Sequence, residues 1–247
     1  MAPTPILGPK RAIVAFVLFF VAQFGAGVLV GIAIGFAFAV RYGGGPEVSS
    51  AIQRAVVVPA AIAGEITGGA VVLRMARRSL PGSLASGALQ PLGWSRAGAR
   101  ATAMASLVGL TLAAVYVVLS ALFPPSLGWM PGPLAAAATS SGWRRDAWAF
   151  LALVVTPPIE EFVFRGVLLT GFRRAWGLAT AGTVVSVLFM AAHLWETGTY
   201  GPAVTAVALL CVGTLVARIV TGSLVPAVAL HAAYNLGLVA MVYLSAR

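Results

Sequence analysis

Residues 157–166 read PPIEEFVFRG, and they place Glu160, Glu161 and Arg165 inside a stretch, residues 147–169, that is otherwise apolar. An ionised side chain held in hydrocarbon costs roughly a few kcal/mol or more, so such groups usually face a protein interior and carry function. The chain has only 6 acidic residues, and two of them are adjacent here. This stretch is therefore the first candidate for a functional site. The alternative is a buried ion pair whose only role is to join two helices.

The composition is that of an integral membrane protein. Hydrophobic residues make up 60% and charged residues 9% of the 247 residues, whereas soluble domains are about 25% charged. The formal net charge is +10, but the basic residues stand in ones, twos and threes between long apolar runs, as in membrane loops. Nucleic acid is therefore not an expected partner. Cys211 is the only cysteine, so we expect a buried small hydrophobe rather than an intramolecular disulfide.

Long apolar runs predict the fold class. A helix needs about 20 apolar residues to cross a hydrocarbon core. Seven runs are long enough: residues 12–40, 55–73, 101–122, 147–169, 178–200, 203–220 and 224–244. They predict an all-α, polytopic transmembrane helical bundle of about seven spans (six to eight), in one membrane domain that covers residues 1–247, with a catalytic cavity between the later helices.

Two linkers and the basic residues predict the orientation. The linker of residues 74–100, with Pro81, is expected to be a basic surface loop, and that of residues 123–146, with Trp129, is expected to lie partly in the interface. With seven spans, the basic residues on the side of the N-terminus are Lys10, Arg11, Arg74, Arg77, Arg78, Arg96, Arg100, Arg173, Arg174 and Arg218. Those on the other side are Arg41, Arg54, Arg144, Arg145 and Arg247. The excess predicts a cytoplasmic N-terminus. The content of Ala, Gly and Arg favours a bacterial inner membrane.

The two histidines of the chain both lie in apolar runs. His193 follows Phe189 by four residues, and His231 precedes Asn235 by four, so each pair shares a helical face. A lone membrane histidine more often makes a hydrogen bond between helices than it catalyses. Two histidines, an asparagine and a glutamate pair on three spans favour one shared site. Tyr234, beside Asn235, is a further candidate for the lining of that site.

Helix geometry separates the two glutamates. Glu161 and Arg165 are four residues apart and can pair on one face, whereas Glu160 points about 100° away around the axis. Glu160 is thus free to face a cavity as a general base. Pro157 and Pro158 lack backbone donors, so we expect a kinked or interrupted helix with opened carbonyls beside Glu160.

Two features of the N-terminal half are also unusual. Gly27, Gly31 and Gly35 recur every fourth residue, which predicts close packing of another helix. Glu65 is a further carboxylate within a span. We expect it to pair with an arginine or a polar side chain of another helix, rather than to serve a substrate or a gate.

Three motifs in order resemble a known family. The pattern Glu160-Glu161-x-x-x-Arg165, then Phe189-x-x-x-His193, then His231-x-x-x-Asn235 is similar to the signature of the CPBP family. This family comprises CAAX-processing and bacteriocin-processing intramembrane endopeptidases of the Abi or Ras-converting-enzyme type. Each motif alone is weak, but the ordered set is specific. The resemblance covers about residues 145–245.

The resemblance implies peptide-bond hydrolysis within the membrane. Glu160 and His193 would activate the attacking water, His231 with Asn235 would stabilise the oxyanion, and Glu161 with Arg165 would hold the first glutamate in place. The implied substrates are prenylated CAAX tails, peptide precursors and leaders, and C-terminal sorting tails. For a bacterial chain, a membrane-anchored protein or peptide tail is favoured over a prenylated one.

Other chemistries are less consistent with the sequence. The only aspartate, Asp146, lies in a loop, and neither histidine begins a His-Glu-x-x-His zinc motif. Zinc held by Glu160, His193 and His231 stays an alternative, although catalysis without a cofactor is preferred. A proton-coupled carrier that uses the same buried groups is a second hypothesis. A non-catalytic immunity or scaffold member of the family is a third.

Overall fold

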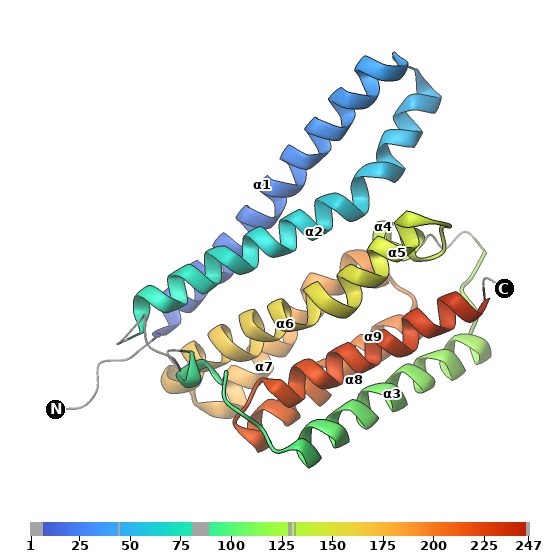
Figure 1. The fold of residues 1–247 in the computed structure, drawn as a ribbon. Coiled ribbons are helices and arrows are strands. Elements are labelled where there is room, and N and C mark those ends of the chain that lie inside the picture. Colours follow the sequence, from blue (N-terminus) through green and yellow to red (C-terminus); the bar gives the residue numbers. More distant parts are fainter. Residues whose placement is uncertain (1–6, 44, 81–88, 128–129, 131, 246–247) are drawn as a thin grey trace.

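The computed structural model describes residues 7–43, 45–80, 89–127, 130 and 132–245, and these residues form helices and connecting turns without a strand (Figure 1). The predicted positions Pro81, Trp129 and Arg247 lie outside the described residues. The π-helical segments are η2 and η3, and η1 is a 3-10 helix. The helices in order are α1 (Pro9–Tyr42), α2 (Pro46–Ser79), η1 (Gln90–Leu92), α3 (Ala99–Leu122), α4 (Pro133–Ala138), α5 (Trp143–Phe150), η2 (Leu151–Val155), α6 (Thr156–Glu161), η3 (Phe162–Leu168), α7 (Leu169–Thr197), α8 (Gly201–Thr221) and α9 (Val225–Ser245).

The predicted spans are present. Among the described residues, 6 helical segments are long and apolar enough to cross a membrane. One of them, Trp143–Thr197, has 55 residues and consists of two helices that meet at Gly177, whose φ of 75° and ψ of 170° are not helical. Positive φ is favourable only for glycine, so this residue sets the reversal. The polytopic helical bundle is thus confirmed, and counting both helices of this segment gives the seven predicted spans.

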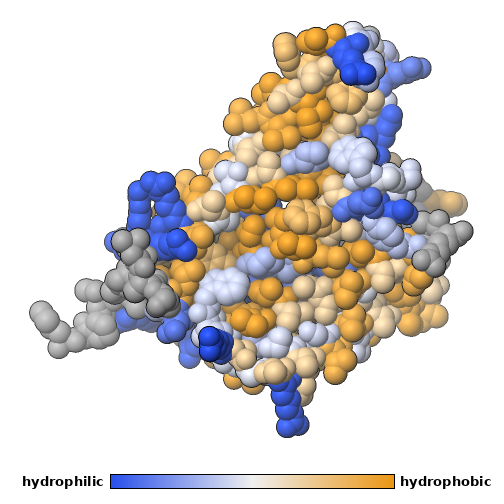
Figure 2. Space-filling model, in the orientation of Figure 1, coloured by the Kyte–Doolittle hydropathy of each residue, from blue (hydrophilic) through white to orange (hydrophobic). Residues whose placement is uncertain are grey.

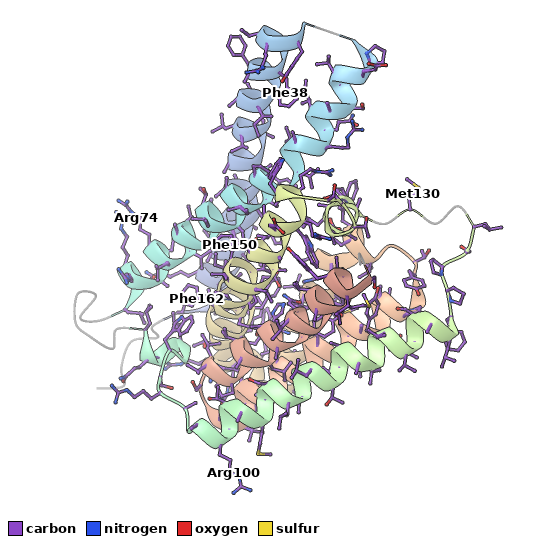
Figure 3. The ribbon with its side chains drawn as sticks, turned by 45° about the vertical axis from the view of Figure 1, so that its right-hand side comes forward. Phe38, Arg74, Arg100, Met130, Phe150 and Phe162 are labelled. Carbon is purple, nitrogen blue, oxygen red and sulfur yellow. The ribbon has the colours of Figure 1, made fainter. Side chains whose placement is uncertain are left out.

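One predicted linker is shorter than expected. Helix α2 continues to Ser79, so Arg74, Arg77 and Arg78 lie on a helix and not in a loop. Arginine is a good helix former, and cations are favourable in the last turn, which explains the extension. Arg74 and Arg100 point outward at the end of the bundle where α2 ends and α3 begins (Figure 3).

Helices α1 and α2 form an antiparallel hairpin whose outer half leans away from the other helices (Figure 1). The predicted glycine stripe forms its interface: a Cβ at Gly27 would lie 3.8 Å from that of Ala60, and one at Gly31 would lie 3.5 Å from Val56 Cγ1. On the opposite side, α1 exposes large apolar side chains, such as Phe24 at 69% and Phe36 at 71%. In an integral membrane protein these face lipid, and Figure 2 shows apolar side chains over the hairpin and the bundle alike.

The segment from α5 to η3 runs through the middle of the molecule, between the hairpin and the helices α8 and α9, with α3 outermost (Figure 1). Its main apolar core includes Phe164, Phe172 and Phe189, together with Phe19 of α1. A second core joins α3, α8 and α9 and includes Tyr234, so this tyrosine packs between helices rather than within the site predicted for it. The main core thereby fixes η3 against α7, and α6 also contacts α9.

Candidate active site

The helix that carries the two glutamates is not interrupted at its prolines, contrary to one predicted outcome. Pro157 and Pro158 lie in the first turn of α6, which continues from η2 without a break, so both lack a backbone N–H inside a continuous helix. The helix changes to π geometry on both sides instead, and the Thr156 N–H donates to the carbonyl of Leu151, five residues earlier. Such π segments are frequent at functional sites.

One carbonyl freed by this register is bound by Asn235. In the π register, the Ala152 carbonyl would accept from the N–H of residue 157, which proline lacks. The amide Nδ2 of Asn235 donates to this carbonyl at 2.7 Å. The third motif is therefore tied to the helix of the first, a contact that the sequence alone did not predict.

Glu161, Arg165 and His231 form what we call the inner cluster, and its side chains are at most 3% exposed. Glu161 Oε2 lies 3.4 Å from Arg165 Nε, which confirms the predicted pair. Glu161 Oε1 accepts from His231 Nδ1 at 2.9 Å. Arg165 also donates through Nη2 to the carbonyl of Cys211 at 3.0 Å, and Cys211 is buried as expected.

Glu160 and His193 form the outer pair. The Oε2 of Glu160 lies 3.7 Å from Nε2 of His193, and their side chains are 16% and 21% exposed. His193 Nδ1 lies 2.8 Å from the Phe189 carbonyl, which only accepts, so Nδ1 carries a hydrogen. In the neutral imidazole, Nε2 is then an acceptor that faces another acceptor. Glu160 Oε2 has no hydrogen-bond partner among the described residues.

Phe189 joins the two groups. Its ring stacks on His193 with centroids 4.3 Å apart, and the Arg165 guanidinium lies 4.1 Å from its centroid on the side of the inner cluster. Phe164 packs edge-on against the same ring at 5.1 Å. The aromatic residue of the second motif thus orients the histidine and stabilises the arginine of the first.

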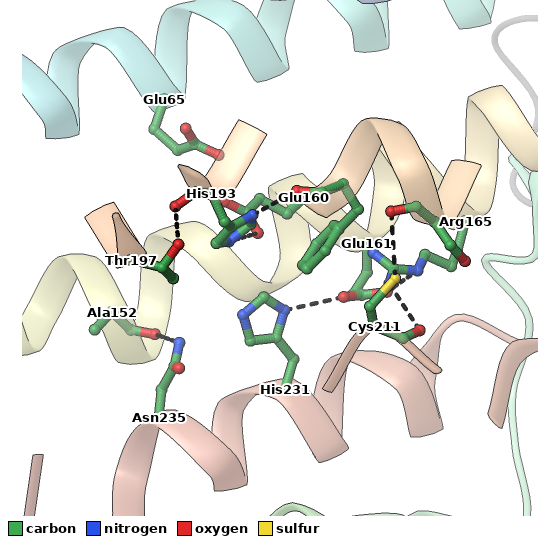
Figure 4. A network of polar contacts seen from close by, with 12 residues as sticks. Glu65, Ala152, Glu160, Glu161, Arg165, His193, Thr197, Cys211, His231 and Asn235 are labelled. Carbon is green, nitrogen blue, oxygen red and sulfur yellow. Dashed lines mark hydrogen bonds and ion pairs between the residues drawn. The ribbon is translucent and has the colours of Figure 1, made fainter. Parts of the chain in front are cut away.

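All six predicted site residues belong to this one neighbourhood, which α6, η3, α7 and α9 build together (Figure 4). Glu160 and His193 form its partly exposed side, and Glu161 and Arg165 form its buried side. His231 and Asn235 come from the same face of α9, but each has a partner in the helix that carries the glutamates. The arrangement can therefore present a reactive carboxylate and imidazole on a rigid, charge-balanced support.

The segment that builds this site also matches a known family. Residues 143–237 match the family model described as type II CAAX prenyl endopeptidase Rce1-like. The match supports membership of the CPBP family. The matched segment begins with α5 and ends within α9, so it contains all three motifs but none of α1, α2 and α3. No curated protein and no solved structure matches the chain significantly.

The alternative site for zinc, made of Glu160, His193 and His231, does not match the geometry. Within the described part of the chain, no three His, Cys, Asp or Glu side chains are grouped to hold a metal ion. Glu160 and His193 face each other, whereas His231 directs Nδ1 to Glu161. These residues do not fit a three-ligand site in this arrangement, and no step below passes through a metal.

The N-terminal hairpin adds a polar pair to the same region. Gln23 Nε2 donates to Glu65 Oε2 at 2.6 Å, so the expected polar partner on another helix is confirmed. The sequence held a signal for this partner, because Gln23 is the only polar side chain between Arg11 and Arg41. Glu65 points from α2 towards the side on which Glu160 and His193 meet (Figure 4).

Proposed function

We propose that this CPBP protein is an intramembrane endopeptidase that hydrolyses a peptide bond in a membrane-anchored protein or peptide tail. The outer pair carries the proposal, because Glu160 and His193 present two facing acceptors, 3.7 Å apart, on the partly exposed side of a buried network. The family match supports peptidase activity at the level of the family. It lends no support to the carrier, and the intact motifs argue against a non-catalytic scaffold.

The facing acceptors suit a bound water molecule. A single water molecule can donate one of its hydrogens to Glu160 and the other to His193. A lone pair of the water oxygen is then free to attack. Attack forms the new C–O bond at the substrate carbonyl while a proton passes to Glu160. Collapse of the tetrahedral intermediate breaks the C–N bond, and Glu160 returns the proton to the leaving nitrogen. The products are a carboxylic acid and an amine, so water is the only co-reactant.

The inner cluster and Asn235 support this step. Glu161 accepts from His231 Nδ1 and so fixes the orientation of the imidazole, and a hydrogen on Nε2 would then donate to an oxyanion. Asn235 donates one amide hydrogen to the Ala152 carbonyl, and its second amide hydrogen can donate to the oxyanion. Arg165 balances the charge of Glu161, so the helix holds Glu160 without a second free carboxylate beside it.

The membrane setting limits the substrate and the location. We propose a bacterial inner membrane with a cytoplasmic N-terminus, because Arg74 and Arg100 lie at the same end of the bundle and belong to the more basic side. A substrate that reaches Glu160 from the bilayer must itself be anchored there, which favours an apolar tail. No cofactor is needed for the step described.

The test is cleavage of synthetic peptides by the purified protein in detergent. Each peptide has one apolar segment of about 20 residues with varied flanks, and products are identified by mass spectrometry. The wild type should cleave a subset, Glu160→Gln should not, and the exposed control Glu47→Gln should behave as the wild type. Equal cleavage by Glu160→Gln and the wild type would remove Glu160 from the mechanism. Cleavage of no peptide by the wild type would count against the proposed activity.

A further inference from the structure

Glu65 is a buried carboxyl group outside the matched family segment. It is 4% exposed, and none of the ion pairs within the described residues includes it. Its Oε2 accepts from Gln23, whereas Oε1 is buried and has no hydrogen-bond partner among the described residues. An unpaired carboxyl oxygen is unfavourable at this depth, so residues that keep one usually serve a ligand.

Close helix packing brings this group to the catalytic region. A Cβ at Gly69 would lie 2.9 Å from Ile159 Cγ2, so the backbone of α2 lies directly on the residue before Glu160. Glu65 is one helical turn before Gly69 and shares its face. Figure 4 accordingly shows Glu65 directed from α2 towards His193 and Glu160.

The hairpin fixes the orientation of the carboxyl group. A Cβ at Gly64 would lie 2.7 Å from the Gln23 carbonyl oxygen, so only glycine allows the two helices to approach this closely. Gln23 then holds Oε2 at 2.6 Å. Because one oxygen is held by α1, the other is left to face the neighbourhood of the outer pair.

A peptide substrate brings the group that this oxygen lacks. A peptide bond must leave helical geometry before water can attack it, and an unwound segment in the membrane has backbone N–H groups without partners. An acceptor beside the scissile bond compensates that loss. We propose that Glu65, held by Gln23, is a substrate-binding residue that accepts a hydrogen bond from a backbone N–H next to the scissile bond. This inference rests on the proposed function.

The first test replaces single backbone amides of the best-cleaved peptide by esters, which removes one N–H at a time. With the wild type, an ester at one position flanking the scissile bond should raise KM about 10-fold, as expected for one lost hydrogen bond. With Glu65→Leu, the same ester should change KM no further, as in a double-mutant cycle. Equal sensitivity of both proteins to every ester would overturn the inference, while the activity itself would stand.

The second test separates substrate binding from bracing of the hairpin. Glu65→Leu should raise KM about 10- to 100-fold with little change in kcat, whereas Glu65→Gln keeps an acceptor and should lose far less. Gln23→Leu removes the contact between α1 and α2 but leaves the carboxyl group, so its effect on KM should be smaller than that of Glu65→Leu. If Gln23→Leu and Glu65→Leu have the same effect, Glu65 only braces the hairpin. If the wild type cleaves no peptide, both proposals fail together.

Discussion

The inner cluster and the outer pair are built from neighbouring residues but differ in almost every physical respect. Glu161 is fully buried, and both of its oxygens face cationic or donor groups at 2.9 and 3.4 Å. Glu160, one residue earlier, is partly exposed and has a single loose contact at 3.7 Å. Two adjacent glutamates thus have contrasting environments, because a helix directs them about 100° apart.

If Glu160 is the general base proposed above, this difference explains how a membrane protein keeps a reactive carboxylate. The ion-paired charges lie on the inside, where an unpaired charge would be most costly, and the carboxylate with the looser contact lies on the partly exposed side. Stability and reactivity should therefore separate by residue. The following changes challenge that separation.

Replacement of the base should give the largest effect. Glu160→Gln keeps the shape but removes the proton acceptor, so kcat should fall about 10²- to 10⁴-fold while the thermal unfolding temperature in detergent stays unchanged. Measurements of kcat and of the unfolding temperature on the same samples test both expectations. A large fall in the unfolding temperature would mean that Glu160 belongs with the inner cluster.

Breaking the inner cluster should act on stability instead. Arg165→Met leaves Glu161 buried beside His231 without its permanent cation, so we expect a loss of about 3–5 kcal/mol in the free energy of unfolding. The double variant Glu161→Leu with Arg165→Met removes both charges and should lose less than the single variant. Denaturant unfolding in detergent tests this order, and the reverse order would refute the role assigned to the pair.

Phe189 touches both groups and should show both effects. Phe189→Leu removes the stack on His193 and the ring beneath Arg165, so about 1–2 kcal/mol of stability and part of kcat should be lost together. Phe172 is a matched control, because it is buried and stacks on Trp176 away from the site. Phe172→Leu should lower stability alone, and an equal loss of kcat in this control would remove the special role of Phe189.

Asn235→Leu should have a smaller effect. The substitution leaves the Ala152 carbonyl without its donor, which costs about 1 kcal/mol. It also removes the amide hydrogen proposed for the oxyanion, so kcat should fall about 10- to 10²-fold. Asn235→Gln retains the amide on a side chain that is one methylene longer, so it should recover only part of the activity. If Asn235→Leu has the kcat of the wild type, Asn235 and its contact with the Ala152 carbonyl are not required for the reaction.

Chelation should have the smallest effect. If Glu160 acts as a general base without a metal, incubation with a chelator followed by dialysis should leave kcat unchanged. Loss of activity that added zinc restores would instead assign Glu160 and His193 as ligands. The outer pair would then be a metal site, and the comparison with the inner cluster would have to be revised.

Much of the fold was predictable, because apolar length alone decides which segments can cross a membrane. The pair of Glu161 and Arg165 was predictable as well, since it depends only on helical spacing. The gap between the runs of residues 147–169 and 178–200 predicted a reversal there, but it did not show that Gly177 makes the reversal with a positive φ. The extension of α2 through Arg74 was missed because charge suggested a loop, although arginine favours helices.

The site was predictable as a set of residues but not as a set of contacts. Motif spacing places His231 and Asn235 on one face, yet it does not show that one binds Glu161 and the other a backbone carbonyl. That carbonyl is available because its partner in the π-helical hydrogen-bond pattern is a proline, which has no N–H. Whether a helix adopts this pattern depends on the packing around it. Gln23 and Glu65 were each recognisable in the sequence as polar residues within apolar runs. Their contact was not predictable, because the two residues are 42 positions apart.

The length of α1 has a consequence for the surrounding lipid. Its 34 helical residues extend about 51 Å, whereas a hydrocarbon core is about 30 Å thick. This hydrophobic mismatch makes the hairpin lie obliquely or thickens the lipid around it, in accordance with its lean in Figure 1. The acyl-chain length of the lipids in reconstituted vesicles should therefore change the tilt of the hairpin. Because α2 carries Glu65, such a change in tilt would move this carboxyl group relative to Glu160.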